Sequence, residues 1–234
     1  MNLQSLVLQH GNVEQPACLV VVDEVPSGDF LGETEKEHLK GFRFPAKREG
    51  FLLGRLAAKR ALAALLEEPD LRQIEIHSGI YGQPLVRHPR AGNLQVSVSH
   101  SHGVAVALAF SADYPMGIDL ETVSAVSAAT IIGELEASPA EFTWLATGGV
   151  DEATACCVLW TAREALGKAL KIGLNSPLGI LSLADIRAGD TGTWLGRYLK
   201  FPRCQCLSQV KNGRVLSLAM PTEVALKPPV LILP

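Results

Sequence analysis

The sequence predicts an α+β fold built from two similar lobes. Two long amphipathic helical segments, 47–66 and 152–172, each stand among short strand-like runs, and a turn-rich cluster at 111–115 separates the two halves. A helix and a sheet bury their apolar faces against each other, so each half is expected to pack its long helix on a small, mainly antiparallel sheet. We expect lobes of residues 1–112 and 113–234, related by a pseudo-twofold axis, with the functional site in the cleft between them.

In the first half of the chain, the predicted elements follow from the spacing at which apolar residues recur. Alternation predicts strands, and apolar residues three or four apart predict helices. Pro69 and Asp70 end the long helix. The predicted elements are a strand at 17–25, a short polar helix at 33–44, the long helix at 47–66, a strand at 72–78, a turn around 79–84, and antiparallel strands at 94–100 and 103–110.

In the second half, a strand at 116–121 opens the lobe. The segment Ser138–Glu141 has the pattern of a helix start, with an N-cap serine, proline at the first helical position and an acid two residues later. The second long helix covers 152–172, and Gly173 is its expected C-cap. Residues 122–137 show no clear period. Further short strands are predicted at 179–186, 193–200, 204–210 and 214–220.

Composition is that of a folded protein. The chain has 234 residues, 47% of them apolar, and no apolar run approaches the roughly 18 residues of a membrane span. Residues 1–15 lack the basic and apolar regions of a signal peptide, so we expect a cytoplasmic protein. Five scattered cysteines predict reduced, buried thiols rather than disulfides. They are Cys18, Cys156, Cys157, Cys204 and Cys206.

Charge is unevenly distributed although the net charge is only -3. Residues 1–162 carry 11 Lys and Arg against 20 Asp and Glu, whereas residues 163–234 carry 10 against 4. The basic part has no interleaved aromatic residues, which disfavours nucleic acid as a partner. An acidic protein or a polyphosphate fits this asymmetry, and so does a solvated face without a partner.

Acidic residues on two predicted elements suggest a metal site. Asp119 and Glu121 point to the same side of a short strand, because strand side chains alternate. On the second long helix, Glu164, Lys168 and Lys171 share one stripe. Three carboxylates beside two ammonium groups suit a divalent cation that holds a phosphate. Taken singly, each feature also fits an exposed strand face or an ordinary surface ion pair.

Two further groups are weaker. Arg48, Arg55 and Lys59 fall on one face of the first long helix, where they could bind phosphate or form a solvated basic face. Ser99 and His100 end a strand, where the imidazole could contact a phosphate oxygen, act as a base, or be structural. No G-x-S-x-G elbow accompanies them, so a serine hydrolase is not indicated.

The order of four motifs is more specific than any one of them. The series G-R-x-A-A-K, S-x-S-H-S, G-I-D-x-E and W-T-x-x-E-A-x-x-K resembles the 4′-phosphopantetheinyl transferases of the surfactin-synthetase (Sfp) type. The resemblance runs from about Arg48 to Gly173. It implies transfer of the phosphopantetheine arm of coenzyme A to a serine of a carrier protein, with release of adenosine 3′,5′-bisphosphate. It also implies a monomer of two lobes with coenzyme A and Mg²⁺ in the cleft.

The resemblance implies roles for the acidic residues. Asp119, Glu121 and Glu164 would hold Mg²⁺ against the pyrophosphate of coenzyme A. Glu164, or a metal-bound water, would accept the proton of the carrier serine, and Lys168 would stabilise the pyrophosphate oxygens. The positions implied to bind coenzyme A are Arg48, Arg55, Lys59, Gln83, Pro84, Ser99, His100 and Lys168.

The chain departs from the family pattern at two positions. Arg163 stands where the family commonly has lysine before the motif glutamate, which exchanges a flexible point charge for a rigid fork. Gln83 replaces the lysine of a Gly-Lys-Pro segment, so a positive charge near the 3′-phosphate is lost unless Lys59 or Arg87 supplies it.

Two other functions stay open. The same carboxylates could serve another Mg²⁺-dependent enzyme on phosphate esters, a nucleotidyl transferase or phosphohydrolase. A non-catalytic protein that binds coenzyme A or a partner is the third possibility. If the protein is a phosphopantetheinyl transferase, its expected partners are coenzyme A and an apo acyl or peptidyl carrier protein, with no nucleic acid and no membrane. Carrier choice is expected to lie in 122–140 and in the C-terminal segment.

Overall fold

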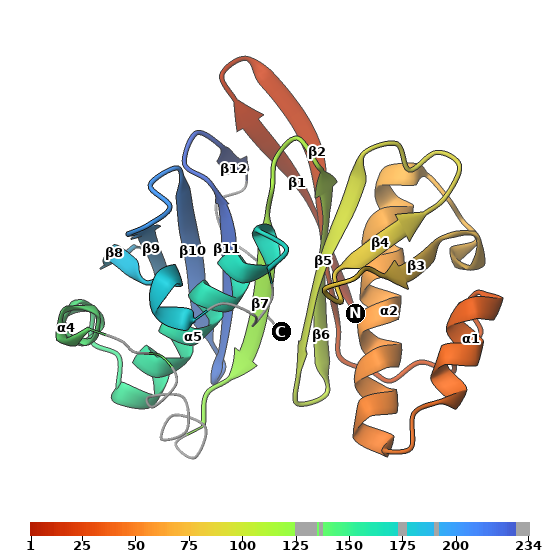
Figure 1. Cartoon of the computed structure of the whole chain (residues 1–234), viewed down its shortest axis with the longest axis horizontal. Helices are drawn as coiled ribbons and strands as arrows, with labels where there is room; N and C mark the ends of the chain where they lie inside the picture. The colour runs from red at the N-terminus through yellow and green to blue at the C-terminus, as the bar shows by residue number, and fades with distance from the viewer. Residues whose placement is uncertain (125–134, 136–137, 173–176, 190–191, 228–234) are drawn as a thin grey trace.

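The computed structural model describes residues 1–124, 135, 138–172, 177–189 and 192–227. Two antiparallel sheets face each other, and a long helix covers the outer face of each sheet (Figure 1). The layers therefore run helix, sheet, sheet, helix. This arrangement confirms the predicted α+β class and the two lobes.

The N-terminal lobe is a five-stranded sheet with α2 on its outer face. Its strand order is β12-β1-β2-β6-β5, and β3 and β4 form a separate hairpin. The elements are β1 (Asn2–His10), β2 (Val13–Val22), α1 (Glu33–Lys40), α2 (Pro45–Leu66), the 3₁₀ turn η1 (Leu71–Gln73), β3 (Glu75–Ser78), β4 (Pro84–Arg87), β5 (Leu94–Ser101) and β6 (Val104–Ser111).

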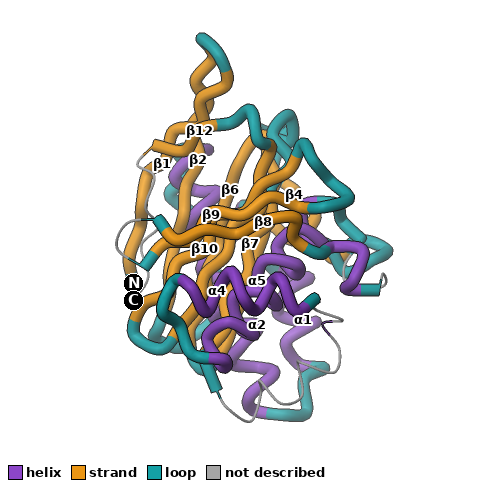
Figure 2. Tube along the Cα trace, turned by 90° about the vertical axis from the view of Figure 1, so that its left-hand side faces the viewer, coloured by secondary structure: helices purple, strands orange, loops and turns teal. Residues whose placement is uncertain are grey.

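The C-terminal lobe has the same architecture, with α5 on the outer face of the sheet β7-β11-β10-β9-β8. Its elements are β7 (Gly117–Thr122), α4 (Pro139–Thr147), α5 (Glu152–Ala169), the 3₁₀ turn η3 (Leu178–Leu181), β8 (Leu183–Ala188), β9 (Thr193–Tyr198), β10 (Cys204–Lys211) and β11 (Arg214–Pro221). The next strand, β12 (Ala225–Lys227), belongs to the N-terminal sheet. Figure 2 views the molecule from the side of this lobe, where α4 and α5 lie across its strands.

Local signals explain where the helices begin. Pro45 occupies the first turn of α2, and the Ser138 hydroxyl and Glu141 carboxylate form the predicted capping box of α4. Asp151 caps α5 by accepting a hydrogen bond from the backbone N–H of Thr154. The expected C-cap of α5 is wrong. Leu170 is the C-cap, and Gly173 lies outside the described residues.

Three strands were not predicted from the sequence, because their apolar runs are short or interrupted. They are β1, β4 and β12. β12 also crosses the expected lobe boundary, since it pairs with β1 from residue 225 to residue 227 and so completes the N-terminal sheet. The lobe expected at 113–234 therefore returns its last described strand to the first lobe.

Three apolar cores hold the layers together. One lies between the two sheets and includes Leu19 and Leu108 from the first sheet and Leu120 and Leu218 from the second. The other two lie between each sheet and its helix. Because the central core draws on both sheets, the lobes are fixed against each other rather than loosely tethered.

The cysteines do not form disulfides: all five are free thiols, four of them buried. Burial raises the pKa of the Cys18 thiol to about 11 and that of Cys157 to about 12. Both thiols therefore stay protonated at neutral pH. Among the described residues, no helix is long and apolar enough to cross a membrane.

Candidate active site

The site is built where the facing edges of the two sheets, β5 and β7, lie side by side. Three serines of β5 alternate along the strand and share one face, and we call them the serine row: Ser97, Ser99 and Ser101. Each of them reaches across to β7, so side chains take the place of a backbone ladder between the lobes.

The serine row touches β7 at successive positions. The backbone N–H of Ile118 donates to Ser97 Oγ (3.0 Å), Ser99 Oγ donates to Asp119 Oδ1 (2.7 Å), and Ser101 Oγ donates to Glu121 Oε2 (2.8 Å). Two of the three carboxylates singled out in the sequence are thus oriented by the opposite lobe. The alternation of serines over residues 97–101 indicates that their side chains share one face, but the sequence predicted a role for Ser99 alone.

The three carboxylates Asp119, Glu121 and Glu164 are brought together by β7 and α5. The pKa of Glu164 is raised to about 7, chiefly by burial and then by the charge of Asp119, with a smaller contribution from Glu121. Burial, and more weakly the charge of Asp119, also raises the pKa of Glu121. These mutual effects require the three groups to lie near one another in a partly dry environment.

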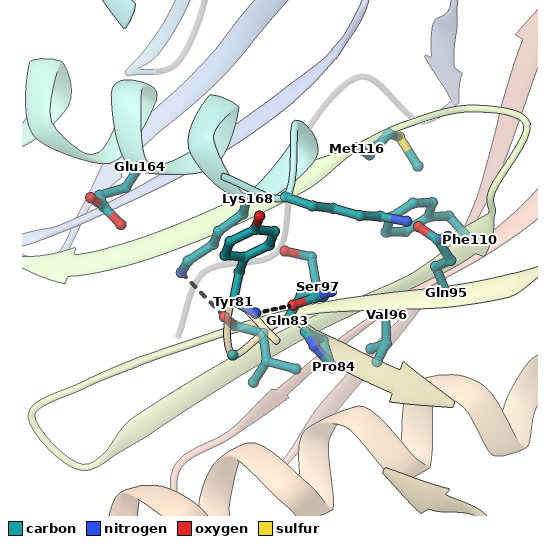
Figure 3. Close-up of a pocket in the computed structure, with 13 residues that line it drawn as sticks. Tyr81, Gln83, Pro84, Gln95, Val96, Ser97, Phe110, Met116, Glu164 and Lys168 are labelled. Atoms are coloured by element: carbon teal, nitrogen blue, oxygen red, sulfur yellow. Dashed lines mark hydrogen bonds between the residues drawn. The ribbon is translucent and has the colours of Figure 1, made fainter. Parts of the chain in front are cut away.

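Lys168 lies against this acidic cluster. Its Nζ forms an ion pair with Asp119 Oδ1 at 2.7 Å and donates to the backbone carbonyl of Val98 at 3.2 Å. The ammonium therefore bridges α5, β7 and β5, and Figure 3 shows it reaching from α5 toward the neighbouring strand. This contact offsets part of the negative charge of the cluster.

The cluster is suited to a hard divalent cation. Asp119 is 4% exposed, and its Oδ2 is buried without a hydrogen-bond partner among the described residues. A cation beside Oδ2 would satisfy that oxygen and relieve the repulsion among the three carboxylates. As the side chains stand, no three His, Cys, Asp or Glu groups in the described part of the chain form a ready-made metal cage. Metal binding therefore requires the side chains to adjust around Lys168.

A cavity of about 300 Å³ lies between the lobes and opens beside the cluster (Figure 3). Gln83 and Pro84 line it from the turn between β3 and β4, and Glu164 and Lys168 line it from α5. Its remaining walls are largely apolar. They come from Tyr81, Gly82, Gln95, Val96, Ser97, Val98, Phe110, Met116 and Lys171. The structure thus brings four of the predicted site residues to one interlobe cavity.

His100 lies on the other side of the seam, over α2. An added Cβ at Gly50 would lie only 2.8 Å from the His100 ring, so this glycine lets the imidazole pack directly on the helix. His100 lines a second cavity of about 430 Å³ with Lys47 and Gly50. Its pKa is lowered by burial and by the positive charge of Lys168. The imidazole is therefore mainly neutral at pH 7.

The basic face expected on α2 is divided by the fold. Arg48 is exposed on the first turns of the helix. Arg55 stacks on Phe51, with its guanidinium carbon 4.9 Å from the ring centroid, and its Nε forms an ion pair with Glu35 Oε1 at 3.5 Å. Lys59 is fully buried in an ion pair with Glu35. The expected contact of Lys59 with coenzyme A is contradicted by this burial.

The two departures from the family pattern also have structural explanations. Arg163 is fully buried on the far side of α5, where it forms an ion pair with Glu141 at 2.7 Å and donates to the carbonyl of Leu135. Its charge is therefore taken up by Glu141 and does not reach the cleft. Gln83 folds back on its own turn, and its Oε1 accepts a hydrogen bond from the N–H of Tyr81 at 2.9 Å.

Comparison with solved structures finds partial likeness to holo-(acyl-carrier-protein) synthases. The enzyme from Bacillus anthracis, in complex with CoA (3′,5′-ADP), is 20% identical over 45% of this chain and 96% of its own, with a TM-score of 0.38. That from Thermotoga maritima is 26% identical over 41% and 61%, with a TM-score of 0.34. That from Helicobacter pylori, in complex with coenzyme A, is 19% identical over 41% and 99%, with a TM-score of 0.30.

The comparison with family models is more informative than the structural likenesses. No curated protein matches the chain. Residues 115–219 match the model of the 4′-phosphopantetheinyl transferase superfamily. The matched segment contains β7 and α5, and therefore the three carboxylates and Lys168. The likeness of this chain to the superfamily therefore rests on residues 115–219, the segment that carries the candidate site.

Proposed function

We propose that this protein transfers the 4′-phosphopantetheine group of coenzyme A to a serine hydroxyl of an apo acyl or peptidyl carrier protein, as an enzyme of the Sfp type. The observation that carries the proposal is the convergence of Asp119, Glu121 and Glu164 beside the interlobe cavity, within the segment that matches the superfamily. Both lobes belong to one chain, and the S-x-S-H-S motif of the first lobe touches the carboxylates of the second.

Glu164 is suited to accept the proton of the attacking serine. In the metal-free protein, burial raises its pKa to about 7, close to the pH at which a general base is most effective, and a bound cation would lower it. The serine oxygen attacks the phosphorus that bears the pantetheine arm, and the bond from that phosphorus to the bridging oxygen breaks. The proton moves to Glu164, and adenosine 3′,5′-bisphosphate leaves.

Lys168 and the carboxylates would handle the phosphate charge. Mg²⁺ bound by Asp119, Glu121 and Glu164 would supply Lewis-acid stabilisation of the negative charge that develops on the leaving bisphosphate. Lys168 already lies between Asp119 and the cavity, from where its ammonium can contact a pyrophosphate oxygen.

Coenzyme A would lie across the two lobes. The turn of Gln83 and Pro84 would contact the adenosine end from the interlobe cavity, with Ser99 close to the phosphates. His100, Arg48 and Arg55 would lie toward the 3′-phosphate. The positive balance of residues 163–234 supports an acidic carrier as the second substrate.

The experiment is intact-mass measurement of an apo acyl carrier protein incubated with this protein, coenzyme A and Mg²⁺, with and without EDTA. A mass gain of one phosphopantetheine group that is lost on chelation is expected. A peptidyl carrier protein provides a second acceptor. No gain with either acceptor would overturn the proposal, and release of inorganic phosphate or pyrophosphate instead would favour a phosphohydrolase or nucleotidyl transferase.

A matched pair of variants tests the site itself. Asp119→Asn keeps the shape of the side chain but removes the charge beside Lys168, and it should abolish transfer. Asp185→Asn makes the same change in an exposed ion pair with Arg197 and should transfer at the normal rate. Normal turnover by Asp119→Asn would contradict the assignment.

A further inference from the structure

Glu121 is held at the end of a short hydrogen-bonded chain that begins in the other lobe. Ser101 Oγ lies 2.8 Å from Glu121 Oε2 and 2.9 Å from Nδ1 of His102. The backbone N–H of Thr122 also donates to Ser101 Oγ, at 3.3 Å. Ser101 is 7% exposed, so these contacts are largely shielded from water.

Counting donors and acceptors fixes the direction of this chain. A serine hydroxyl has one hydrogen to donate and two lone pairs to accept. An ionised Glu121 can only accept, so the single hydrogen of Ser101 goes to Oε2. The N–H of Thr122 fills one lone pair, and His102 fills the other only if Nδ1 carries its proton. The chain therefore runs from His102 through Ser101 to Glu121.

The backbone at His102 is unusual for its residue type. His102 and Gly103 form the two-residue turn between β5 and β6 and have φ of 44° and 76°, the signature of a type I′ turn. Asparagine followed by glycine is the common choice in such turns, and this chain uses Asn212 and Gly213 for the turn between β10 and β11. At the β5–β6 turn a histidine takes the place of the usual asparagine, and its side chain meets Ser101.

We propose that Ser101 and His102 are positioning residues that set the orientation of Glu121 toward the metal. Ser101 anchors Oε2, which leaves the other carboxylate oxygen of Glu121 for the cation, and His102 anchors Ser101. This inference rests on the proposed function. The inference adds that the N-terminal lobe determines how tightly the carboxylates of the C-terminal lobe bind Mg²⁺.

The experiment measures Mg²⁺ affinity in two ways. One is the Mg²⁺ concentration that gives half-maximal transfer. The other is the Mg²⁺ concentration that gives half of the thermal stabilisation, measured without coenzyme A or carrier. Ser101→Ala should raise both midpoints by about 10-fold to 100-fold, the usual effect of losing a residue that orients a metal ligand. Ser101→Thr, which keeps the hydroxyl, should restore them.

The chain offers a matched control in the same row. Ser97 makes an equivalent bond across the seam, but to the backbone N–H of Ile118. Ser97→Ala should therefore lower thermal stability and leave unchanged the Mg²⁺ midpoint of the thermal titration, which is measured without coenzyme A. His102→Asn should raise the midpoint while the melting temperature stays the same or rises, because asparagine suits the turn better.

The outcomes separate the inference from the proposed function. Wild-type Mg²⁺ midpoints in Ser101→Ala, or an equal shift in Ser97→Ala, would overturn the positioning role. A wild-type protein that transfers nothing would overturn the function, and the thermal titration would still test how Ser101 acts on Mg²⁺ binding.

Discussion

Replacing Gly117 by alanine is expected to separate the two halves of the site. Gly117 begins β7 directly beneath α5. An added Cβ would lie 2.5 Å from the backbone nitrogen of Ala169 and closer still to the carbonyl oxygen of Ala165. Carbon and oxygen atoms rarely approach below about 3.3 Å, and both obstacles are helix backbone, so α5 would have to move by roughly 1 Å.

The expected cost follows from what α5 carries. Overpacking of this kind costs about 1–3 kcal/mol of unfolding free energy. The displacement also moves Glu164 and Lys168 away from Asp119, which stays on β7. A misplacement of about 1 Å at a reacting site costs on the order of 100-fold in rate. Urea unfolding measures the first effect, and kcat/KM for the apo carrier protein measures the second.

Gly54→Ala makes the same chemical change in the other lobe and serves as the control. Its added Cβ would lie 3.3 Å from Cγ1 of Val98, a side-chain atom that can move. Alanine also favours the helix over glycine by about 1 kcal/mol, so this variant should be as stable as the wild type or more stable. Gly117→Ala with wild-type stability and wild-type kcat/KM would refute the reasoning.

Two further predictions concern buried charges. Arg163→Met leaves the Glu141 carboxylate buried without its cation and should lower the unfolding free energy, measured in urea, by about 3–5 kcal/mol. The double variant Arg163→Met/Glu141→Gln should recover part of that loss. An unchanged unfolding curve for Arg163→Met would contradict the stabilising role of this ion pair. Burial raises the folded-state pKa of Glu164 above its unfolded value, to about 7. In metal-free buffer, this residue's contribution to stability is full below about pH 4.5 and is lost as pH rises through about 7, so Glu164→Gln should flatten that decline in thermal melts.

The sequence alone determined most of the elements and which residue types the candidate site contains. Local signals are short in range, so the capping box at Ser138 and the alternation of β5 and β6 predicted their elements closely. Asp119 and Glu121 could be assigned to one face because a strand alternates strictly, and Glu164 and Lys168 because they lie one helical turn apart. The order of the motifs then pointed to the superfamily whose model matches residues 115–219.

Only the tertiary structure decided which charges face the cleft. Arg163 and Lys59 carry the same charge as Lys168, yet both are buried in ion pairs with Glu141 and Glu35. The sequence defines the faces of a helix, but the element that packs on each face comes from a distant part of the chain. In the same way, β12 is distant in sequence from β1, the strand with which it pairs in the N-terminal sheet. The contact of Ser101 with Glu121 arises in the same way, because the alternating serines define one face of β5 but not the strand that lies against it.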